Sequence, residues 1–413
     1  MKNKYLEDNK LSAVLFGTAF LLYTIVYMTK TMFSAAMASI VEVGIMSKSQ
    51  VGAINAGFWA VYAVGQIVGG FAVDKYSPVK LIIVGLVGGV AANMVIYFNQ
   101  SYNVILIAWC LNAAFQFAIW PGVFKILSTQ VAPEFRPVAV FWILFATSVG
   151  EIISMLVASV VSNWKYNFII CALGLMIVIF LWVVIYTKLK GYMTGSEDAQ
   201  TNNKIYVSKW NMGAVVSVSG LPILMIVSLL VTMVFNSIKM LTPVMLMESY
   251  DAMPAAIATR LSMIMVVFTM LGMFCAKFVR SRITQHELKA AALLLSCGIP
   301  TMALVSMVGK IPYIAVLGFL IVTIVSLQSV YPFTNTFVSR RFVFCGRTGT
   351  VAGLLNAMGS MGNICASYLF PKFSEFMSWK IIVIIWCSMS ILAIVLSLSI
   401  TRKWTSFIKK EQL

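Results

Sequence analysis

The sequence predicts an all-α membrane protein with about twelve transmembrane helices in two six-helix bundles. Of its 413 residues, 61% are hydrophobic and only 10% are charged, whereas soluble domains carry roughly 25% charged residues. A soluble fold could not hide so much apolar surface. The apolar residues also form continuous runs of about 20 residues or more, which is the length of a spanning helix. Barrel strands would alternate apolar and polar residues instead.

Twelve apolar runs emerge with a hydropathy window of roughly 19 residues. Several exceed the roughly 20 residues that cross a bilayer at right angles, so we expect tilted or curved helices. The expected spans are 11–42, 49–73, 79–98, 102–130, 137–162, 166–187, 219–247, 255–279, 288–309, 312–339, 348–370 and 380–401.

The longest polar link divides these spans six and six. We therefore predict one bundle over 1–187, a central linker over 188–218 and a second bundle over 219–413. The halves echo each other weakly, since Trp120-Pro121 resembles Tyr331-Pro332. Parallel half-repeats of this kind are a transporter architecture, in which the binding site lies between the halves near the bilayer midplane.

The distribution of Lys and Arg predicts the orientation. If the amino terminus is cytoplasmic, 21 of the 30 basic residues fall in cytoplasmic segments and 6 fall outside. This bias places both termini in the cytoplasm. We expect a multi-pass protein of the cell membrane, surrounded by membrane lipid.

Several other classes of protein are disfavoured. The net charge of +17 does not indicate nucleic acid, because the basic residues lie in short clusters between apolar runs rather than on one face. The seven cysteines show no ligand spacing and are expected to be reduced packing residues. The lone His286 lies in a link, where we expect it to be solvated. We expect no enzyme, no metal and no cofactor.

Lys30 lies past the middle of the first span. A charge inside a bilayer costs roughly 2.5–3.5 kcal/mol on insertion scales and usually marks a pathway. We interpret Lys30 as the contact for an anionic substrate. The alternative is a lysine that pairs structurally with a carboxylate.

Glu151 is the one acidic residue that the expected spans place deep within the membrane. A desolvated carboxylate favours its protonated form unless a cation compensates it. We interpret Glu151 as a carrier of the coupling proton, which could act through an ion pair with Lys30. A permanent salt bridge that fixes helix packing is the alternative.

Two further lysines lie within spans. Lys239 is in the outer half of the seventh span and could supply positive charge from the second bundle. Lys125 is near the cytoplasmic end of the fourth span. Both could instead extend their long stems to the membrane surface.

Polar and aromatic side chains within the spans suggest a wet cavity, although each one alone is more often a helix-packing residue. The candidate substrate-binding residues, besides the three lysines, are Tyr27, Tyr62, Gln66, Gln116, Trp120, Asn236, Tyr331, Asn335 and Asn356.

The segment Gly69 to Lys80, between the second and third spans, resembles the loop signature of the major facilitator superfamily. The resemblance implies the major facilitator fold over nearly the whole chain. It also implies that Asp74, Lys75 and Lys80 form a cytoplasmic gate. Lys75 stands where the family usually has Arg.

A narrower resemblance, to the organophosphate:phosphate antiporters and related organic anion symporters, rests on Tyr27 to Met37 and Gln116 to Lys125. The chain differs from that group at its charged positions. Lys30 replaces an Arg, Gln66 replaces a Lys, and the Arg of the seventh span falls near Phe235 or Asn236. Because Arg grips phosphate through a planar fork and Lys is a point charge, the specialised phosphate site is not reproduced.

These observations predict a secondary transporter of a small organic anion, such as a sugar phosphate or sugar acid, which is coupled to protons or to a counter-anion. We expect a monomer. Drug or metabolite efflux is one alternative, and a transporter-like membrane sensor is another.

Overall fold

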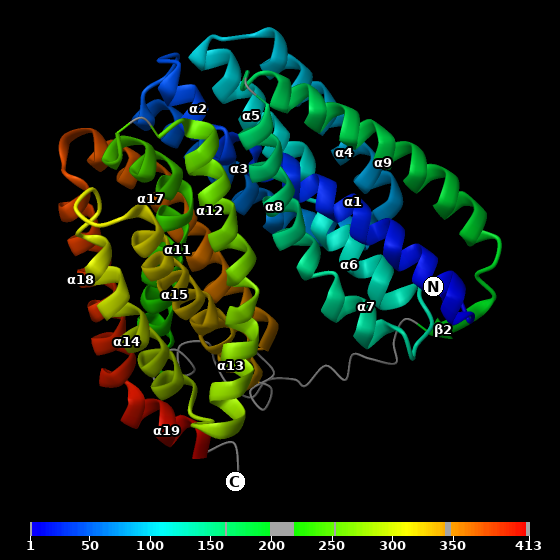
Figure 1. The fold of residues 1–413 in the computed structure, drawn as a ribbon. Helices are drawn as coiled ribbons and strands as arrows, with labels where there is room; N and C mark the ends of the chain where they lie inside the picture. The colour runs from blue at the N-terminus through cyan, green and yellow to red at the C-terminus, as the bar shows by residue number, and fades with distance from the viewer. Residues whose placement is uncertain (1, 162, 199–218, 252, 343–347, 410–413) are drawn as a thin grey trace. The chain divides into compact units, whose positions relative to one another are not determined.

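The computed structural model describes residues 2–161, 163–198, 219–251, 253–342 and 348–409, which are largely helical (Figure 1). The chain forms two compact units, Met1–Lys204 and Ile205–Leu413. The division falls inside the expected linker, although the linker's own boundaries stay a prediction. Residues 199–218 of that linker lie outside the described part.

The first unit contains the first six expected spans, three of which are split by short breaks. Its helices are α1 (Asn9–Ala35), α2 (Met37–Glu42), α3 (Lys48–Lys75), α4 (Pro78–Phe98), α5 (Tyr102–Gln116), α6 (Ile119–Thr129), α7 (Arg136–Trp142), α8 (Phe145–Val160) and α9 (Tyr166–Lys190).

The second unit contains the remaining six and ends with a short extra helix. Its elements are α11 (Leu221–Ser249), α12 (Ala255–Thr269), α13 (Leu271–Arg282), α14 (Glu287–Val305), α15 (Tyr313–Tyr331), the π-helical segment η1 (Pro332–Phe337), α16 (Val338–Arg340), α17 (Thr348–Phe376), α18 (Trp379–Ser399) and α19 (Thr401–Lys409).

In the described part of the chain, ten helices are long and apolar enough to cross a membrane. The helices α3 and α17 occupy the two other expected spans and have 28 and 29 residues, so the total of twelve stays a prediction. Most ends lie within a few residues of expectation. The helix α17 continues to Phe376, beyond the apolar run, because a helix need not stop where the lipid does.

One short sheet was not expected from the sequence. Strand β1 (Lys2–Tyr5) pairs antiparallel with β2 (Gly195–Asp198), with Lys2 opposite Asp198. The pairing joins the chain before α1 to the chain after α9. Part of the expected linker is therefore anchored to the first unit.

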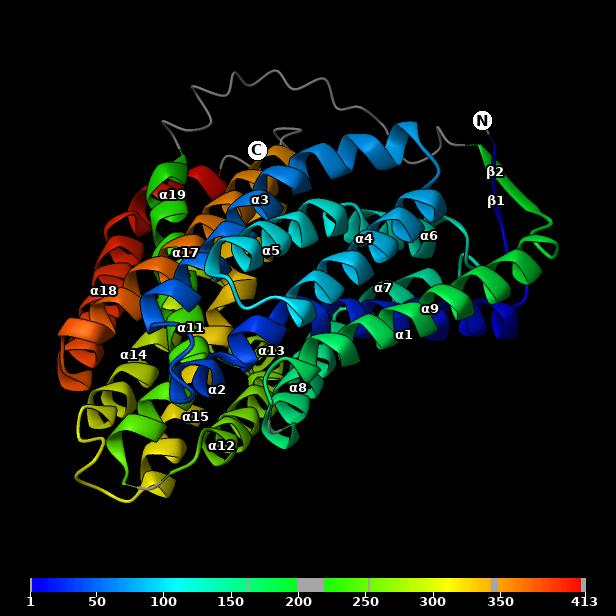
Figure 2. The ribbon, with the colours of Figure 1, turned by 90° about the horizontal axis from the view of Figure 1, so that it is seen from above.

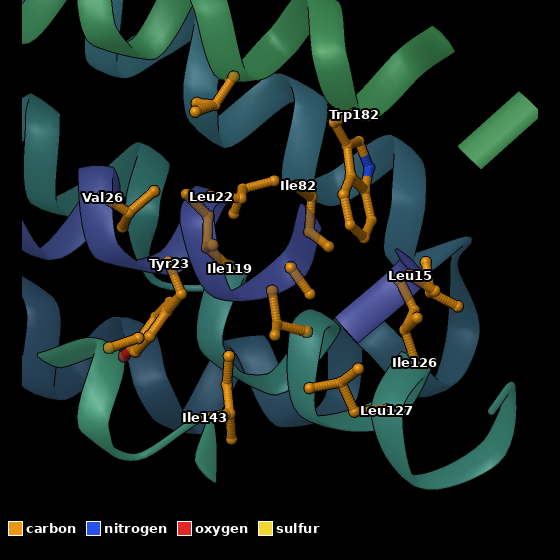
Figure 3. Packing of buried hydrophobic residues seen from close by; sticks show 14 of the residues in the cluster. Leu15, Leu22, Tyr23, Val26, Ile82, Ile119, Ile126, Leu127, Ile143 and Trp182 are labelled. Carbon is orange, nitrogen blue, oxygen red and sulfur yellow. The ribbon is translucent and has the colours of Figure 1, made fainter. Parts of the chain in front are cut away.

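The core of the first unit gathers around α1. Leu15, Leu22 and Val26 on α1 are fully buried in the same cluster as Ile82 of α4 and Ile119 of α6 (Figure 3). The helix α4 also packs against α5 and α9 (Figure 2). Burial of such side chains positions α1, the helix that carries Lys30.

A second core lies where α19 packs against the rest of the second unit. Trp404 and Phe407 of α19 are fully buried against Phe342, Leu288 and Leu221. The opposite side of α19 exposes charged residues. The helix is therefore amphipathic and docks by its apolar face.

Two glycines show that the halves share one packing pattern. A Cβ on Gly150 of α8 would strike α1 at the residues Thr24, Tyr27 and Met28. A Cβ on Gly362 of α17 would strike α11 at the residues Leu229, Thr232 and Met233, which have the same spacing. In each case the contact atoms are a carbonyl oxygen, a Cβ and an amide nitrogen, in that order along the helix.

A second pair of contacts repeats in the same way. Gly65 of the second span would strike Phe117 of the fourth, and Gly272 of the eighth span would strike Gln328 of the tenth. Glycine permits these close approaches because it has no side chain. The weak sequence repeat therefore has a structural basis, and it defines equivalent positions in the two units.

Candidate functional site

The ammonium of Lys30 is buried in the first unit among aromatic side chains. Its side chain is only 3% exposed, and its Nζ atom donates a hydrogen bond of 2.8 Å to the Tyr62 hydroxyl. The same nitrogen lies 4.2 Å from the ring centroid of Tyr62 and 5.5 Å from that of Tyr23. Aromatic rings attract a cation through their quadrupole, so the two tyrosines stabilise a charge that the membrane disfavours.

Lys30 has no carboxylate partner among the residues that the structure describes. An ammonium has three N–H donors, and Tyr62 accepts only one hydrogen bond from it. The site can therefore give further donors to an anion. The ion pair between Lys30 and Glu151 that the sequence suggested does not form, because the lysine is directed to α3 while Glu151 belongs to α8.

Tyr23 is a site residue that the sequence analysis missed. It is 4% exposed, and its ring lies 4.8 Å from that of Trp120 and 6.2 Å from that of Tyr27. Figure 3 shows the Tyr23 ring directed away from Trp182. Helical spacing could have revealed it, since Tyr23, Tyr27 and Lys30 are at i, i+4 and i+7. We call Lys30, Tyr23, Tyr27, Tyr62 and Trp120 the aromatic lysine site.

Gln116 is fully buried rather than open to a cavity. Its Nε2 atom donates to Asn112 Oδ1 at 2.6 Å and to Thr29 Oγ1 at 3.3 Å. Thr29 directly precedes Lys30 on α1. Gln116 therefore supports the helix that carries the lysine, and its contact with a substrate stays a prediction.

Gln66 compensates for a proline. Pro121 has no N–H, so the carbonyl of Phe117, four residues earlier, lacks its helical donor. Gln66 Nε2 donates to that carbonyl at 3.2 Å. An exposed polar group would be costly in lipid, and this bond explains why a glutamine lies here. Its role in substrate binding is untested.

Lys125 and Glu151 also have defined surroundings. The Nζ atom of Lys125 donates to the carbonyl of Val73 in the last turn of α3, at 2.7 Å, and so satisfies a carbonyl at a helix end. Glu151 is half-buried on α8 directly after Gly150, and its backbone carbonyl accepts a bond from Ser154 Oγ. Ser154 in turn accepts a 2.8 Å bond from Thr31 of α1.

The repeat identifies the counterparts of these residues in the second unit. Lys30 follows Tyr27 by the same interval as Phe235 follows Thr232, so Phe235 occupies the lysine position. Likewise Asn363 follows Gly362 and is the counterpart of Glu151. At these equivalent positions the first unit has the lysine and the glutamate, whereas the second unit has a phenylalanine and an asparagine.

Asn236 and Lys239 lie near these counterparts on α11. Asn236 Nδ2 donates to Asn363 Oδ1 and, at 2.9 Å, to the carbonyl of Thr232. Lys239 places its ammonium 4.9 Å from the ring centroid of Phe235. The second unit therefore also has a cation over an aromatic ring, one helical turn beyond the position equivalent to Lys30.

Three more candidate residues lie around η1 and α17. The Tyr331 hydroxyl donates to Asn356 Oδ1 at 3.5 Å. Asn335 is 8% exposed, and neither amide atom has a partner within the described residues. A buried amide without partners is unfavourable, so Asn335 offers unused hydrogen-bonding capacity. π-helical segments are frequent at functional sites.

The expected gate residues are only partly described. Asp74 lies on α3, but its side chain is outside the described part. Lys75 is exposed, with its ammonium 5.7 Å from the ring centroid of Tyr76, and Lys80 is exposed at the start of α4. The gating role of all three stays a prediction.

The helical fold and its half-repeat define a class of multi-pass membrane proteins, and comparison with known families agrees. The profile of the Major Facilitator Superfamily matches residues 19–344. The chain belongs to the Major Facilitator Superfamily, as its loop signature and half-repeat predicted.

The curated relatives include a sensor and a transporter. The chain is 26% identical over 161 residues to the membrane sensor protein UhpC of Salmonella typhimurium, a match that covers 38% of this chain and 36% of that protein. It is 27% identical over 158 residues to a probable hexose phosphate transport protein of Chlamydia pneumoniae, covering 37% and 34%. The chain thus aligns with about a third of each relative.

Two solved structures with similar folds are distant in sequence. A bacterial homologue of the human lysosomal transporter Spinster gives a TM-score of 0.79 at 12% identity, over 97% of this chain and 99% of that one. A D-xylose-proton symporter gives a TM-score of 0.73 at 13% identity, over 94% and 97%. These matches establish the major facilitator fold of a predominantly helical membrane protein.

Proposed function

We propose that the chain is a secondary active transporter of a small organic anion, which works by alternating access at the cell membrane with both termini in the cytoplasm. The observation that carries the proposal is the buried Lys30 ammonium, which has one hydrogen-bond acceptor and two aromatic neighbours. A buried cation without a carboxylate gains most from an anionic ligand.

The aromatic lysine site also favours a particular chemical structure for the uncharged part of this anion. The ring of Tyr23 lies 5.5 Å from the ammonium, and the rings of Tyr27 and Trp120 lie 6.2 Å and 4.8 Å from that of Tyr23. Such surfaces suit the C–H faces and hydroxyls of a sugar-like molecule. Sugar phosphates and sugar acids share these features, and relatives named as hexose phosphate transport proteins support this class.

Glu151 is the proposed proton carrier. It lies at the contact between α8 and α1, next to the glycine that brings these helices together. Its counterpart Asn363 is an amide that cannot ionise. The proposed coupling chemistry therefore belongs to the first unit alone. Exchange against a counter-anion is the alternative mode.

The test uses purified protein in liposomes and a panel of labelled anions that includes a hexose phosphate and a hexuronate. We expect saturable uptake of at least one anion, and a loss of at least about tenfold in Lys30→Met, the effect of roughly 1.4 kcal/mol in binding. Lys190→Gln, which removes an exposed lysine, is the matched control. Wild-type uptake by Lys30→Met would overturn the proposal.

The coupling role has its own test. Glu151→Gln should abolish uptake driven by a proton gradient and should keep exchange between labelled and unlabelled substrate. Equal loss, or equal retention, in both assays would contradict proton coupling.

A membrane sensor is the second candidate, because two of the curated relatives are named as the sensor UhpC. A sensor would bind the anion through the same lysine without moving it. Lys30-dependent binding in detergent together with no flux in liposomes would favour the sensor over the transporter.

A further inference from the structure

Near α19, the second unit contains a buried carboxylate whose two oxygens both accept hydrogen bonds. Glu287 is 0% exposed at the start of α14. Its Oε1 atom accepts from Arg341 Nε at 2.8 Å, and its Oε2 atom accepts from Trp404 Nε1 at 3.2 Å. The positive end of the α14 dipole also faces this carboxylate. Glu287 therefore has little capacity left to balance further cations.

Two more arginines lie in the same region. Arg280 packs on the ring of Phe337, and Arg340 lies in the chain between Phe337 and Arg341, the partner of Glu287. Three guanidinium groups against one carboxylate leave two net positive charges. We call these four residues the arginine cluster.

Arg280 has unused hydrogen-bonding capacity. Its guanidinium carbon lies 3.8 Å from the ring centroid of Phe337, so the ring covers one face. Its Nη1 atom is buried and has no acceptor within the described residues. Arg340 is exposed at the end of α16. A buried guanidinium N–H without an acceptor is costly, and an anion would satisfy it.

The surroundings of the cluster are basic and lie at helix ends. Exposed residues beside it include Arg282, Lys289, Arg402 and Lys403. Within the described segments 276–289, 338–342 and 400–409, Glu287 is the one acidic residue. These segments adjoin the ends of spanning helices, on the side that the distribution of Lys and Arg assigns to the cytoplasm.

The helix α19 indicates where this basic region lies. It buries Trp404 and Phe407 and exposes Arg402 and Lys403. Because its apolar face packs on the protein core, the basic side chains stay exposed at the end of the spanning helix α18. Basic pockets on the cytoplasmic side attract the headgroups of anionic lipids.

We propose that the arginine cluster binds the phosphate group of an anionic phospholipid in the cytoplasmic leaflet. Guanidinium groups bind phosphate oxygens through paired, parallel N–H donors. Arg280 supplies the buried donor and Arg340 the exposed one, while Glu287 holds Arg341 in place. This binding is independent of the transported substrate.

The test compares purified protein in nanodiscs of phosphatidylcholine with the same protein in nanodiscs that also contain phosphatidylglycerol. We expect phosphatidylglycerol to raise the thermal midpoint of the wild type by at least about 2 °C, since a ligand that binds only the native state stabilises it. Arg280→Gln and Arg340→Gln should each lose at least half of this rise. Arg260→Gln, which removes an exposed arginine elsewhere in the same unit, should keep it.

Each variant is compared with itself in the two lipids, so a general loss of stability does not affect the result. If Arg280→Gln does not fold, Arg280→Lys keeps the charge and loses the fork, and it should show a reduced rise. An equal rise in wild type and in both cluster variants would overturn the proposal. So would an equal rise in phosphatidylcholine nanodiscs on addition of millimolar inorganic phosphate, which would identify a site for free phosphate instead.

Discussion

The ammonium nitrogen of Lys30 donates a 2.8 Å hydrogen bond to the hydroxyl of Tyr62, which belongs to α3. This bond ties the buried charge to α3 and orients the ammonium toward the rings around it. A hydrogen bond to a charged group contributes roughly 1.5–3 kcal/mol.

Tyr62→Phe should therefore destabilise the protein, because the ring remains but the acceptor is lost. Tyr62→Leu should destabilise it further, since the cation–π contact is lost as well. Thermal unfolding of both variants and of the Lys30→Met/Tyr62→Phe double mutant measures the coupling, which we expect to reach about 1–3 kcal/mol. Additive effects of the two single substitutions would show that the bond contributes nothing.

Gly150→Ala and Gly362→Ala should both destabilise the protein. Each added methyl would collide with backbone atoms of the neighbouring helix, and overpacking of this kind costs typically about 1–3 kcal/mol. Gly17→Ala is the control, because a Cβ there meets nothing within 4 Å and alanine favours a helix. The measurement is the midpoint of thermal unfolding of each variant. Unchanged stability in Gly150→Ala or in Gly362→Ala would contradict the shared packing pattern.

Gln66→Leu should reduce stability by about 1–3 kcal/mol, because the carbonyl of Phe117 would lose its donor inside the membrane. The second substitution Pro121→Ala should restore it, since alanine supplies the missing helical N–H. Uptake measured on the same variants separates the roles of Gln66. Recovered stability without recovered uptake would assign Gln66 a direct contact with the substrate.

Acidification should weaken the anchoring of α14 through His286. Its Nδ1 atom accepts a 3.5 Å bond from the backbone N–H of Lys289, and its Nε2 atom contacts Thr405 of α19 at 3.0 Å. The side chain is thus half-buried rather than solvated as the sequence suggested. Partial burial lowers the pKa of His286, and the positive charges of Lys289 and Arg341 lower it further while Glu287 opposes them.

Because the folded-state pKa lies below the unfolded value of about 6.5, this contribution to stability is present above pH 6.5 and is lost as the pH falls through the folded pKa. His286→Asn keeps a capping side chain that does not titrate. The thermal midpoint of the wild type should fall more between pH 7 and pH 5 than that of His286→Asn. Parallel curves would refute the role of His286.

The spans were predictable because each is a local property of the chain. An apolar run and its flanking charges identify a helix without any knowledge of its neighbours. Helical spacing also relates Tyr23, Tyr27 and Lys30 to one face of α1. These features account for most of the fold.

The partners of the polar residues were not predictable, because they depend on how helices are rotated against each other. Nothing local indicates that Lys30 meets Tyr62 rather than Glu151, or that Gln66 satisfies a carbonyl freed by Pro121. The buried Glu287 was missed for the same reason, since its partners come from the distant segments α19 and Arg341.

The pairing of β1 with β2 brings the beginning and the end of the first unit together. Neighbouring ends are the condition for circular permutation, in which the old ends are fused and new ones are opened elsewhere. A break between Tyr76 and Ser77, where α3 gives way to α4, would keep each span in its original direction through the bilayer. In the permuted protein, α1 would be synthesised near the end of the unit rather than at its start. The order in which the helices are synthesised would then differ, while their arrangement in the fold would stay the same.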